Sequence, residues 1–145
     1  MPEKVQNFDN HAKIVPAFHF FVVPILILNF ISSIVRVFRA PAYWTVVSLL
    51  VAIALVLLAF TARMFAVTVQ DRVIRLEMRL RLQQVLPQDM KPRIPEFTLS
   101  QLLSLRFASD AELPDLARKV LDEKLTDRKA IKKLIRGWQP DYLRA

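Results

Sequence analysis

The sequence predicts an all-α membrane protein: an antiparallel two-helix transmembrane hairpin, with the second helix extended into the cytoplasm and followed by a small C-terminal three-helix unit. Two long runs without formal charge lie within the first 62 of the 145 residues. Gly137 is the only glycine and cysteine is absent, which excludes disulfides, Gly-rich phosphate loops and dinucleotide-binding fingerprints. The net charge of +8 suits anionic lipid, nucleic acid or an acidic protein partner.

The two apolar runs are each long enough to cross a bilayer. Residues 14–35 carry no formal charge and extend about 33 Å as a helix, which matches a hydrocarbon layer of about 30 Å. This run exceeds the apolar region of a cleavable signal peptide. Residues 43–62 form the second run and begin with Tyr43 and Trp44, whose rings favour the headgroup level. Two buried helices of a soluble protein are the alternative, but too little other sequence remains to cover them.

The short connection between the runs predicts the topology. Residues 36–42 suffice only to turn the chain, so the spans are expected to be antiparallel, with the N-terminal arm (residues 1–13) and the tail on one side. Basic residues near the spans are more numerous on that side than in the loop, which holds Arg36 and Arg39. The positive-inside rule therefore places both termini in the cytoplasm and the spans in the inner (cytoplasmic) membrane.

Small and polar side chains in the spans predict helix packing. Polar groups at membrane depth usually face another helix, and small side chains at spacings of four and seven allow close approach. The predicted packing residues are Asn29, Ser32, Ser33, Ser48, Ala52 and Ala59. Pro24 lacks an N–H, so it should leave the carbonyl of Phe20 unpaired and bend the first span.

His19 is the one candidate cofactor ligand. No cofactor is predicted outright, but neutral imidazole beside Phe18, Phe20 and Phe21 suits an axial ligand to a haem or chlorophyll-type tetrapyrrole. The alternative is an ordinary interhelical or interfacial hydrogen bond, favoured because the spans hold no second histidine. No catalytic residue and no metal site are predicted.

Residues 63–86 should continue the second span as a juxtamembrane amphipathic helix, since nothing breaks helix between Trp44 and Pro87. Val69, Val73, Leu76 and Leu80 recur at spacings of four, three and four, which predicts an amphipathic stretch of about two heptads, too short to indicate a coiled coil by itself. The basic residues around it would hold anionic lipid or a partner, or form a solvated face. With a second basic stripe further along, the predicted lipid or partner contacts are Arg72, Arg75, Arg79, Arg81, Lys129, Lys132, Lys133 and Arg136.

A Pro-rich stretch, residues 87–96, predicts a semi-rigid extended linker before a helical tail, residues 97–145. Thr98 with Gln101, and Ser109 with Glu112, form capping boxes, and residues 126–127 offer a third helix start. The third helix should place Ile131, Leu134, Ile135 and Trp138 on one face. A unit of about 50 residues is undersized for a self-sufficient core, so the tail is expected to dock on the juxtamembrane helix, the membrane or a partner.

Four segments carry a resemblance to a known family: QNFDNH (residues 6–11), QDRVIRLEMRLRL (70–82), LRFASDAELP (105–114) and AIKKLIRGWQPDY (130–142). In these segments the chain resembles an uncharacterised bacterial family of small two-span membrane proteins with a helical cytoplasmic tail, a domain of unknown function. The likeness covers nearly the whole chain. It implies the two-span topology and assigns no activity, cofactor or site residue.

The sequence favours an accessory or structural subunit of a larger membrane complex and does not favour an enzyme. The spans lack the charged groups of a transport path, and no catalytic constellation can be assembled. Expected partners are other subunits of the complex and anionic lipid. A homo-oligomer is compatible with the sequence, and nucleic acid is not expected. The alternatives are a haem or pigment-binding subunit through His19 and an anionic-lipid tether.

Overall fold

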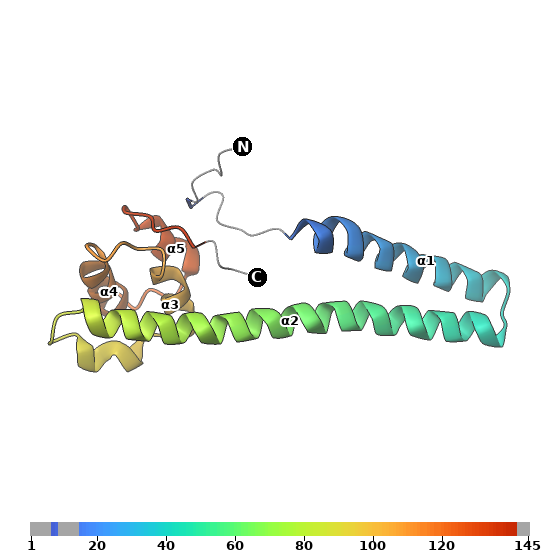
Figure 1. The fold of residues 1–145 in the computed structure, drawn as a ribbon, viewed down its shortest axis with the longest axis horizontal. Coiled ribbons are helices and arrows are strands. Elements are labelled where there is room, and N and C mark those ends of the chain that lie inside the picture. The colour runs from blue at the N-terminus through green and yellow to red at the C-terminus, as the bar shows by residue number, and fades with distance from the viewer. Residues whose placement is uncertain (1–6, 9–14, 142–145) are drawn as a thin grey trace. The chain divides into compact units, whose positions relative to one another are not determined.

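The computed structural model describes residues 7–8 and 15–141, and every regular element among them is helical (Figure 1). The elements are the π-helix η1 (Ala17–Val22), α1 (Val23–Arg39), α2 (Tyr43–Val85), the 3-10 helix η2 (Lys91–Glu96), α3 (Leu99–Leu105), α4 (Leu113–Asp122) and α5 (Arg128–Lys133). The described residues form two compact units that meet within α2. We call residues 15–68 the span unit and residues 69–141 the tail unit. The predicted N-terminal arm, apart from residues 7–8, lies outside the described residues.

The span unit contains two helices long and apolar enough to cross a membrane. The first runs continuously through η1 and α1, Ala17–Arg39, and the second is the N-terminal part of α2. Only 6% of the residues in the most apolar window of each helix are buried, so these helices expose their large side chains as lipid-facing helices do. The all-helical class and the two apolar helices are thus confirmed. The antiparallel arrangement of the spans stays a prediction.

Pro24 marks a change of helix geometry in the first span. The residues before it form the π-helix η1, in which the N–H of Val23 donates to the carbonyl of Phe18, five residues earlier. Pro24 is the second residue of α1 and directly follows the π-helix, inside a continuous helical segment, where it has no N–H to donate. The structure thus has a π-helix on the N-terminal side of Pro24, and the bend of the first span stays a prediction.

The connection between the spans is shorter than the predicted loop of residues 36–42. The helix α1 continues to Arg39, which leaves three residues before α2. Thr45 organises this turn: its Oγ1 accepts from the N–H of Ala42 at 2.9 Å and donates to the carbonyl of Ala42 at 2.7 Å. Arg36 lies inside α1, where its Nη2 donates to Oγ of Ser33 at 3.4 Å.

The tail unit has one apolar core, to which α2 contributes a face other than the predicted amphipathic stripe. Ile74, Met78 and Leu82 are buried at spacings of four, whereas Val69, Val73, Leu76 and Leu80 are 49–63% exposed. Both series recur at helical spacing, so periodicity alone did not identify the buried one. The core residues are Ile74, Met78, Leu82, Leu86, Met90, Ile94, Phe97, Leu102, Leu103, Leu105, Ala108, Leu113, Leu116, Ala117, Val120, Leu121 and Ile131.

The Pro-rich stretch, residues 87–96, is not an extended linker. After a turn it forms η2, and Met90, Ile94 and Phe97 on either side of its prolines are buried in the core. The fixed φ of proline is compatible with a 3-10 helix as well as with extended chain, and the apolar residues between the prolines favour the compact form. This segment therefore packs against the tail helices.

The capping signals predict helix starts better than helix lengths. The Thr98–Gln101 box is complete, and Asp127 caps α5 by accepting from the N–H groups of Lys129 and Ala130. Half of the Ser109–Glu112 box forms, since Glu112 Oε1 accepts from the N–H of Ser109 at 3.2 Å and α4 begins at Leu113. The helix α5 ends at Lys133, so Ile135 and Trp138 lie beyond it.

Candidate functional site

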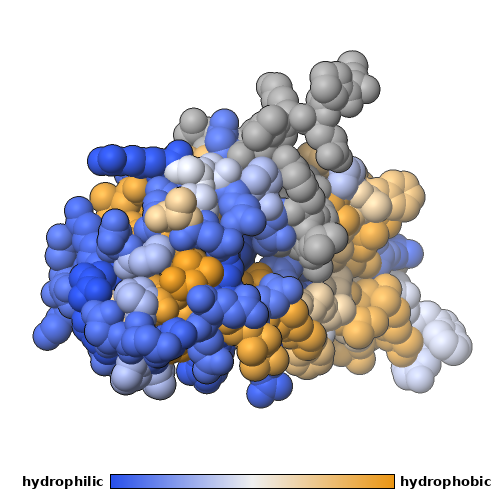
Figure 2. Space-filling view, turned by 60° about the vertical axis from the view of Figure 1, so that its left-hand side comes forward, coloured by the Kyte–Doolittle hydropathy of each residue, from blue (hydrophilic) through white to orange (hydrophobic). Residues whose placement is uncertain are grey.

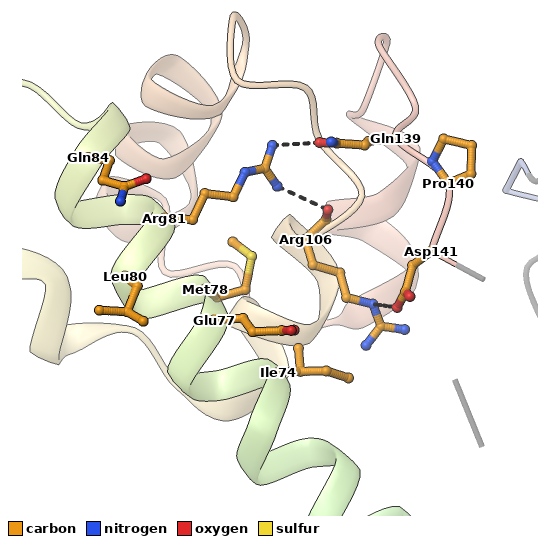
Figure 3. Close-up of a pocket in the computed structure, with 10 residues that line it drawn as sticks. All are labelled: Ile74, Glu77, Met78, Leu80, Arg81, Gln84, Arg106, Gln139, Pro140 and Asp141. Carbon is orange, nitrogen blue, oxygen red and sulfur yellow. Dashed lines mark hydrogen bonds and ion pairs between the residues drawn. The ribbon is translucent and has the colours of Figure 1, made fainter. Parts of the chain in front are cut away.

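An open groove of about 690 Å³ lies in the tail unit where α2 meets the end of the chain (Figure 3). Figure 3 shows side chains from α2, from the segment after α3 and from the C-terminal segment around it. The lining residues are Ile74, Glu77, Met78, Leu80, Arg81, Gln84, Arg106, Gln139, Pro140 and Asp141. Its lining combines thioether and aliphatic groups with two guanidinium groups, two carboxylates and two amides.

Arg81 is the central polar group of this region. Its Nε donates to Oδ1 of Asp110 at 2.7 Å, and its Nη1 donates to the carbonyl of Arg106 at 3.1 Å. Its Nη2 donates to the carbonyl of Ala108 at 2.6 Å and to Oε1 of Gln139 at 2.8 Å. The side chain is 20% exposed, so these bonds are largely shielded from water. Arg81 thus clamps α2 to two segments that are distant in sequence, and we reassign it from lipid or partner contact to this internal role.

A second set of contacts holds the C-terminal segment in place. The rings of Phe107 and Trp138 stack with their centroids 4.5 Å apart and their planes at 14°. The guanidinium of Arg106 lies 4.4 Å from the Phe107 ring centroid, and its Nε is 3.2 Å from Oδ2 of Asp141. Such stacked and cation-π contacts contribute about 0.5–1.5 kcal/mol each beyond the burial of the rings.

Glu112 and Gly137 explain why this segment can approach so closely. Glu112 Oε1 accepts from the N–H of Gly137 and Oε2 accepts from the N–H of Arg136, both at 3.0 Å. The N–H of Ser109 in turn donates to the carbonyl of Gly137 at 3.0 Å. A Cβ at position 137 would lie 2.7 Å from Oγ and 3.2 Å from Cβ of Ser109, so glycine lets this segment lie against Ser109 without displacing its side chain. The signal in the sequence was that this chain of 145 residues has a single glycine.

His19 faces its own helix in the span unit. It is exposed, its Nδ1 lies 2.9 Å from the carbonyl oxygen and 3.2 Å from the backbone nitrogen of Val15, and the Phe18 ring stands edge-on at 5.3 Å. No group of three or more His, Asp or Glu side chains suited to a metal ion occurs in the part of the chain that the structure describes. Its role as a tetrapyrrole ligand stays a prediction.

The predicted packing residues differ widely in burial. Ser33 on α1 and Ala52 on α2 are each 1% exposed, Asn29, Ser48 and Ala59 are half-buried, and Ser32 is exposed. Ser48 Oγ donates to the carbonyl of Trp44 at 2.8 Å, so this hydroxyl is satisfied within its own helix. A small cavity of about 20 Å³ is lined from both helices, by Phe18, Val23, Leu26, Ile27, Val56, Ala59 and Phe60. The packing role of the whole set stays a prediction.

The basic residues predicted to meet lipid or a partner differ in exposure. Arg72, Arg75, Lys129, Lys133 and Arg136 are exposed. Lys132 and Arg79 are half-buried, and the Lys132 ammonium lies 5.0 Å from the Phe107 ring centroid. Hydrophilic side chains cover much of the tail unit in Figure 2, whereas hydrophobic ones gather over the span helices.

Ion pairs hold the outer edges of the tail unit. Arg118 Nη2 lies 2.7 Å from Oδ2 of Asp89, and the hydrogen bond from Arg118 lowers the pKa of Asp89. Arg93 Nη1 lies 2.8 Å from Oδ1 of Asp122, and this hydrogen bond raises the pKa of Arg93. Asp89, Arg118 and Asp122 are exposed and Arg93 is half-buried, so water screens both pairs and they add little to stability.

In the comparison with protein families, residues 1–145 match a family of unknown function, DUF6526, and the chain belongs to that family. No curated protein and no solved structure matches the chain. Family membership agrees with the resemblance that the four sequence segments carried. It assigns no activity to the groove or to His19.

Proposed function

We propose that this DUF6526 member is an accessory or structural subunit of a larger membrane complex, without catalytic chemistry of its own. In this proposal the two apolar helices form an antiparallel hairpin in the inner membrane, and the tail unit is a cytoplasmic docking platform. The supporting observation is that α2 belongs to both units: the helix of the second span also supplies core residues Ile74, Met78 and Leu82 to the tail.

The composition of the groove also favours docking over catalysis. Arg81 uses all three nitrogens in hydrogen bonds within the chain, and Arg106 is matched by Asp141. A catalytic site needs reactive groups held next to a space for the substrate, whereas these guanidinium groups are committed to holding the fold. The apolar side chains Ile74, Met78 and Leu80 beside them suit a segment of another protein.

Purification tests the accessory role directly. The tagged full-length protein should be extracted in mild detergent and its stable partners identified by mass spectrometry. Specific subunits that co-purify in fixed ratio, and are lost when Arg81→Gln loosens the tail unit, would support the proposal. A monomer or homodimer without any other subunit would contradict it.

The topology has its own test, because the chain contains no cysteine. A single cysteine in the loop (Ala40→Cys) should react with a membrane-impermeant maleimide added to the outside of intact spheroplasts. A single cysteine in the tail (Lys124→Cys) should react only after the membrane is permeabilised. The reverse pattern would place the termini outside, and labelling of both from outside would exclude the hairpin.

A further inference from the structure

An apolar stripe on α2 remains uncovered in the tail unit. Val69, Val73, Leu76 and Leu80 are 49–63% exposed. The tail helices instead cover the opposite face of α2, at Ile74, Met78 and Leu82. Because the tail already has its core, it does not need this stripe for folding.

The spacing of the stripe is that of a coiled-coil seam. Intervals of four, three and four place Val69 and Leu76 at heptad d positions and Val73 and Leu80 at a positions. Val73 at a with Leu76 at d is the combination that favours two parallel strands, whereas Val69 at d and Leu80 at a have the reverse order, so the orientation is argued from the flanking charges. Counted back along the sequence, the same register places the small residue Ala66 at the preceding a position.

The residues that flank the stripe carry complementary charges for one arrangement only. Arg72 and Arg79 occupy g positions and Glu77 occupies an e position. In a parallel pair of α2 helices, Arg72 of each copy faces Glu77 of the other, whereas an antiparallel pair brings the g-position arginines together. Within the described residues, neither Arg72 nor Glu77 forms an ion pair with another side chain.

We propose that α2 pairs with α2 of a second copy of this chain, through a parallel coiled coil centred on Val73 and Leu76. Two copies inserted in one membrane share an orientation, which makes the parallel arrangement the accessible one, and confinement in the membrane raises their effective concentration. The tail units lie on the outer faces of the pair, since they cover the side of α2 that is opposite to the seam. This self-association rests on the membrane insertion proposed above and not on the accessory role.

Cysteine cross-linking of the full-length protein in membranes tests the seam, and the chain has no native cysteine that could interfere. Val73→Cys and Leu76→Cys should each give a disulfide-linked dimer on mild oxidation. The matched control is Arg75→Cys, an exposed position in the same turn that lies at heptad position c, away from the seam. We expect roughly tenfold more dimer from the seam positions than from position 75, because only a and d side chains meet across the pair. Equal yields at all three positions would overturn the proposal.

Charge exchange tests the partner and the orientation. On the Leu76→Cys background, Arg72→Glu or Glu77→Arg alone should lower the dimer yield, and the two together should restore it. These side chains are exposed, so the protomer should keep its fold, which circular dichroism would verify. If the cysteine at position 76 is shielded from a water-soluble maleimide but gives no dimer, lipid or a different protein covers the stripe and self-pairing is wrong. That result would leave the accessory role intact.

Discussion

In the span unit many large apolar side chains are exposed, and the hydroxyls of Ser48, Thr61 and Thr68 bond to carbonyls of their own helix. In the tail unit the large apolar side chains converge on one core, and polar groups join segments that are far apart in sequence. Ser48 and Thr61 show the first pattern, with their Oγ atoms bonded three or four residues back. Arg81 and Glu112 show the second, with partners 24 to 58 residues away.

This difference is the one expected of a helix that enters a membrane at one end and lies in water at the other. In lipid, apolar contacts between helices bring little gain over contacts with lipid, so backbone and hydroxyl groups must be satisfied locally. In water, burial of apolar area stabilises the fold, and long-range polar contacts select one arrangement of the buried surfaces. The change between the two patterns falls within α2, without a break in the helix.

The largest loss of stability is expected from a substitution in the core of the tail unit. Leu82→Ala should destabilise the tail unit by about 3 kcal/mol, because Leu82 is fully buried and the change leaves a cavity. The matched variant Leu80→Ala, two residues away on the exposed stripe, should change the stability of the protomer by less than about 0.5 kcal/mol. Urea unfolding of the full chain in detergent, followed by Trp138 fluorescence in a Trp44→Phe background, measures both. Equal effects would mean that the buried face of α2 is misassigned.

The polar side of the tail unit is tested by Arg81→Gln. This change removes a largely buried guanidinium and leaves the carbonyls of Arg106 and Ala108 without their donor, so a loss of about 2–3 kcal/mol is expected. Arg75→Gln on the exposed face serves as the control, with a change near zero. The same unfolding assay measures both variants. An Arg81 variant as stable as the control would show that the hydrogen bonds of Arg81 do not stabilise the tail unit.

The close approach at Gly137 is tested by Gly137→Ala. The new Cβ would lie 2.7 Å from Oγ of Ser109, and the required shift should destabilise the tail by about 1–3 kcal/mol. The double variant Gly137→Ala with Ser109→Ala removes that oxygen and should recover part of the loss. Two effects that simply add in the unfolding assay would show that the two positions do not touch.

The smallest expected effect is on the stability of the tail unit at low pH. The hydrogen bond from Arg118 holds the folded-state pKa of Asp89 below its ordinary value of 3.8, so the unfolded chain binds a proton more readily. The contribution of this pair is therefore complete above that ordinary value and is lost as the pH falls through the lower folded-state pKa. Asp89→Asn should flatten the acid side of the stability profile slightly, and Arg118→Gln should have the same effect. A steeper profile in either variant would reverse the sign of the linkage.

Local signals in the sequence predicted local structure well. The two apolar runs, the uninterrupted helix from Tyr43 to Val85 and the capping box at Thr98 were all legible, because each depends on residues a few positions apart. The burial of Ala52 and Ser33 agrees with the expected packing of small residues, although it does not test the role of the whole set.

The errors arose where two local patterns were equally consistent with a helix. Val73 and Leu76 on one face of α2, and Ile74 and Met78 on another, both recur at helical spacing, and only the position of the tail decided which face is buried. The prolines of residues 87–96 suggested an extended linker, but burial of Ile94 between them favoured a 3-10 helix. The local sequence does not distinguish Arg81 from the surface arginines, because its partners are up to 58 residues away.

The sequence by itself determined that this protein is helical, that two of its helices are apolar enough for a membrane, and that the second continues into a charged tail. These properties follow from hydropathy, helix spacing and the absence of breakers, which act over a few residues. Only the tertiary structure decided which face of α2 the tail covers, that Arg81 clamps it, and why the single glycine lies at position 137. These features depend on contacts between segments that are distant in sequence. A pattern of neighbouring residues does not contain the energies of such contacts.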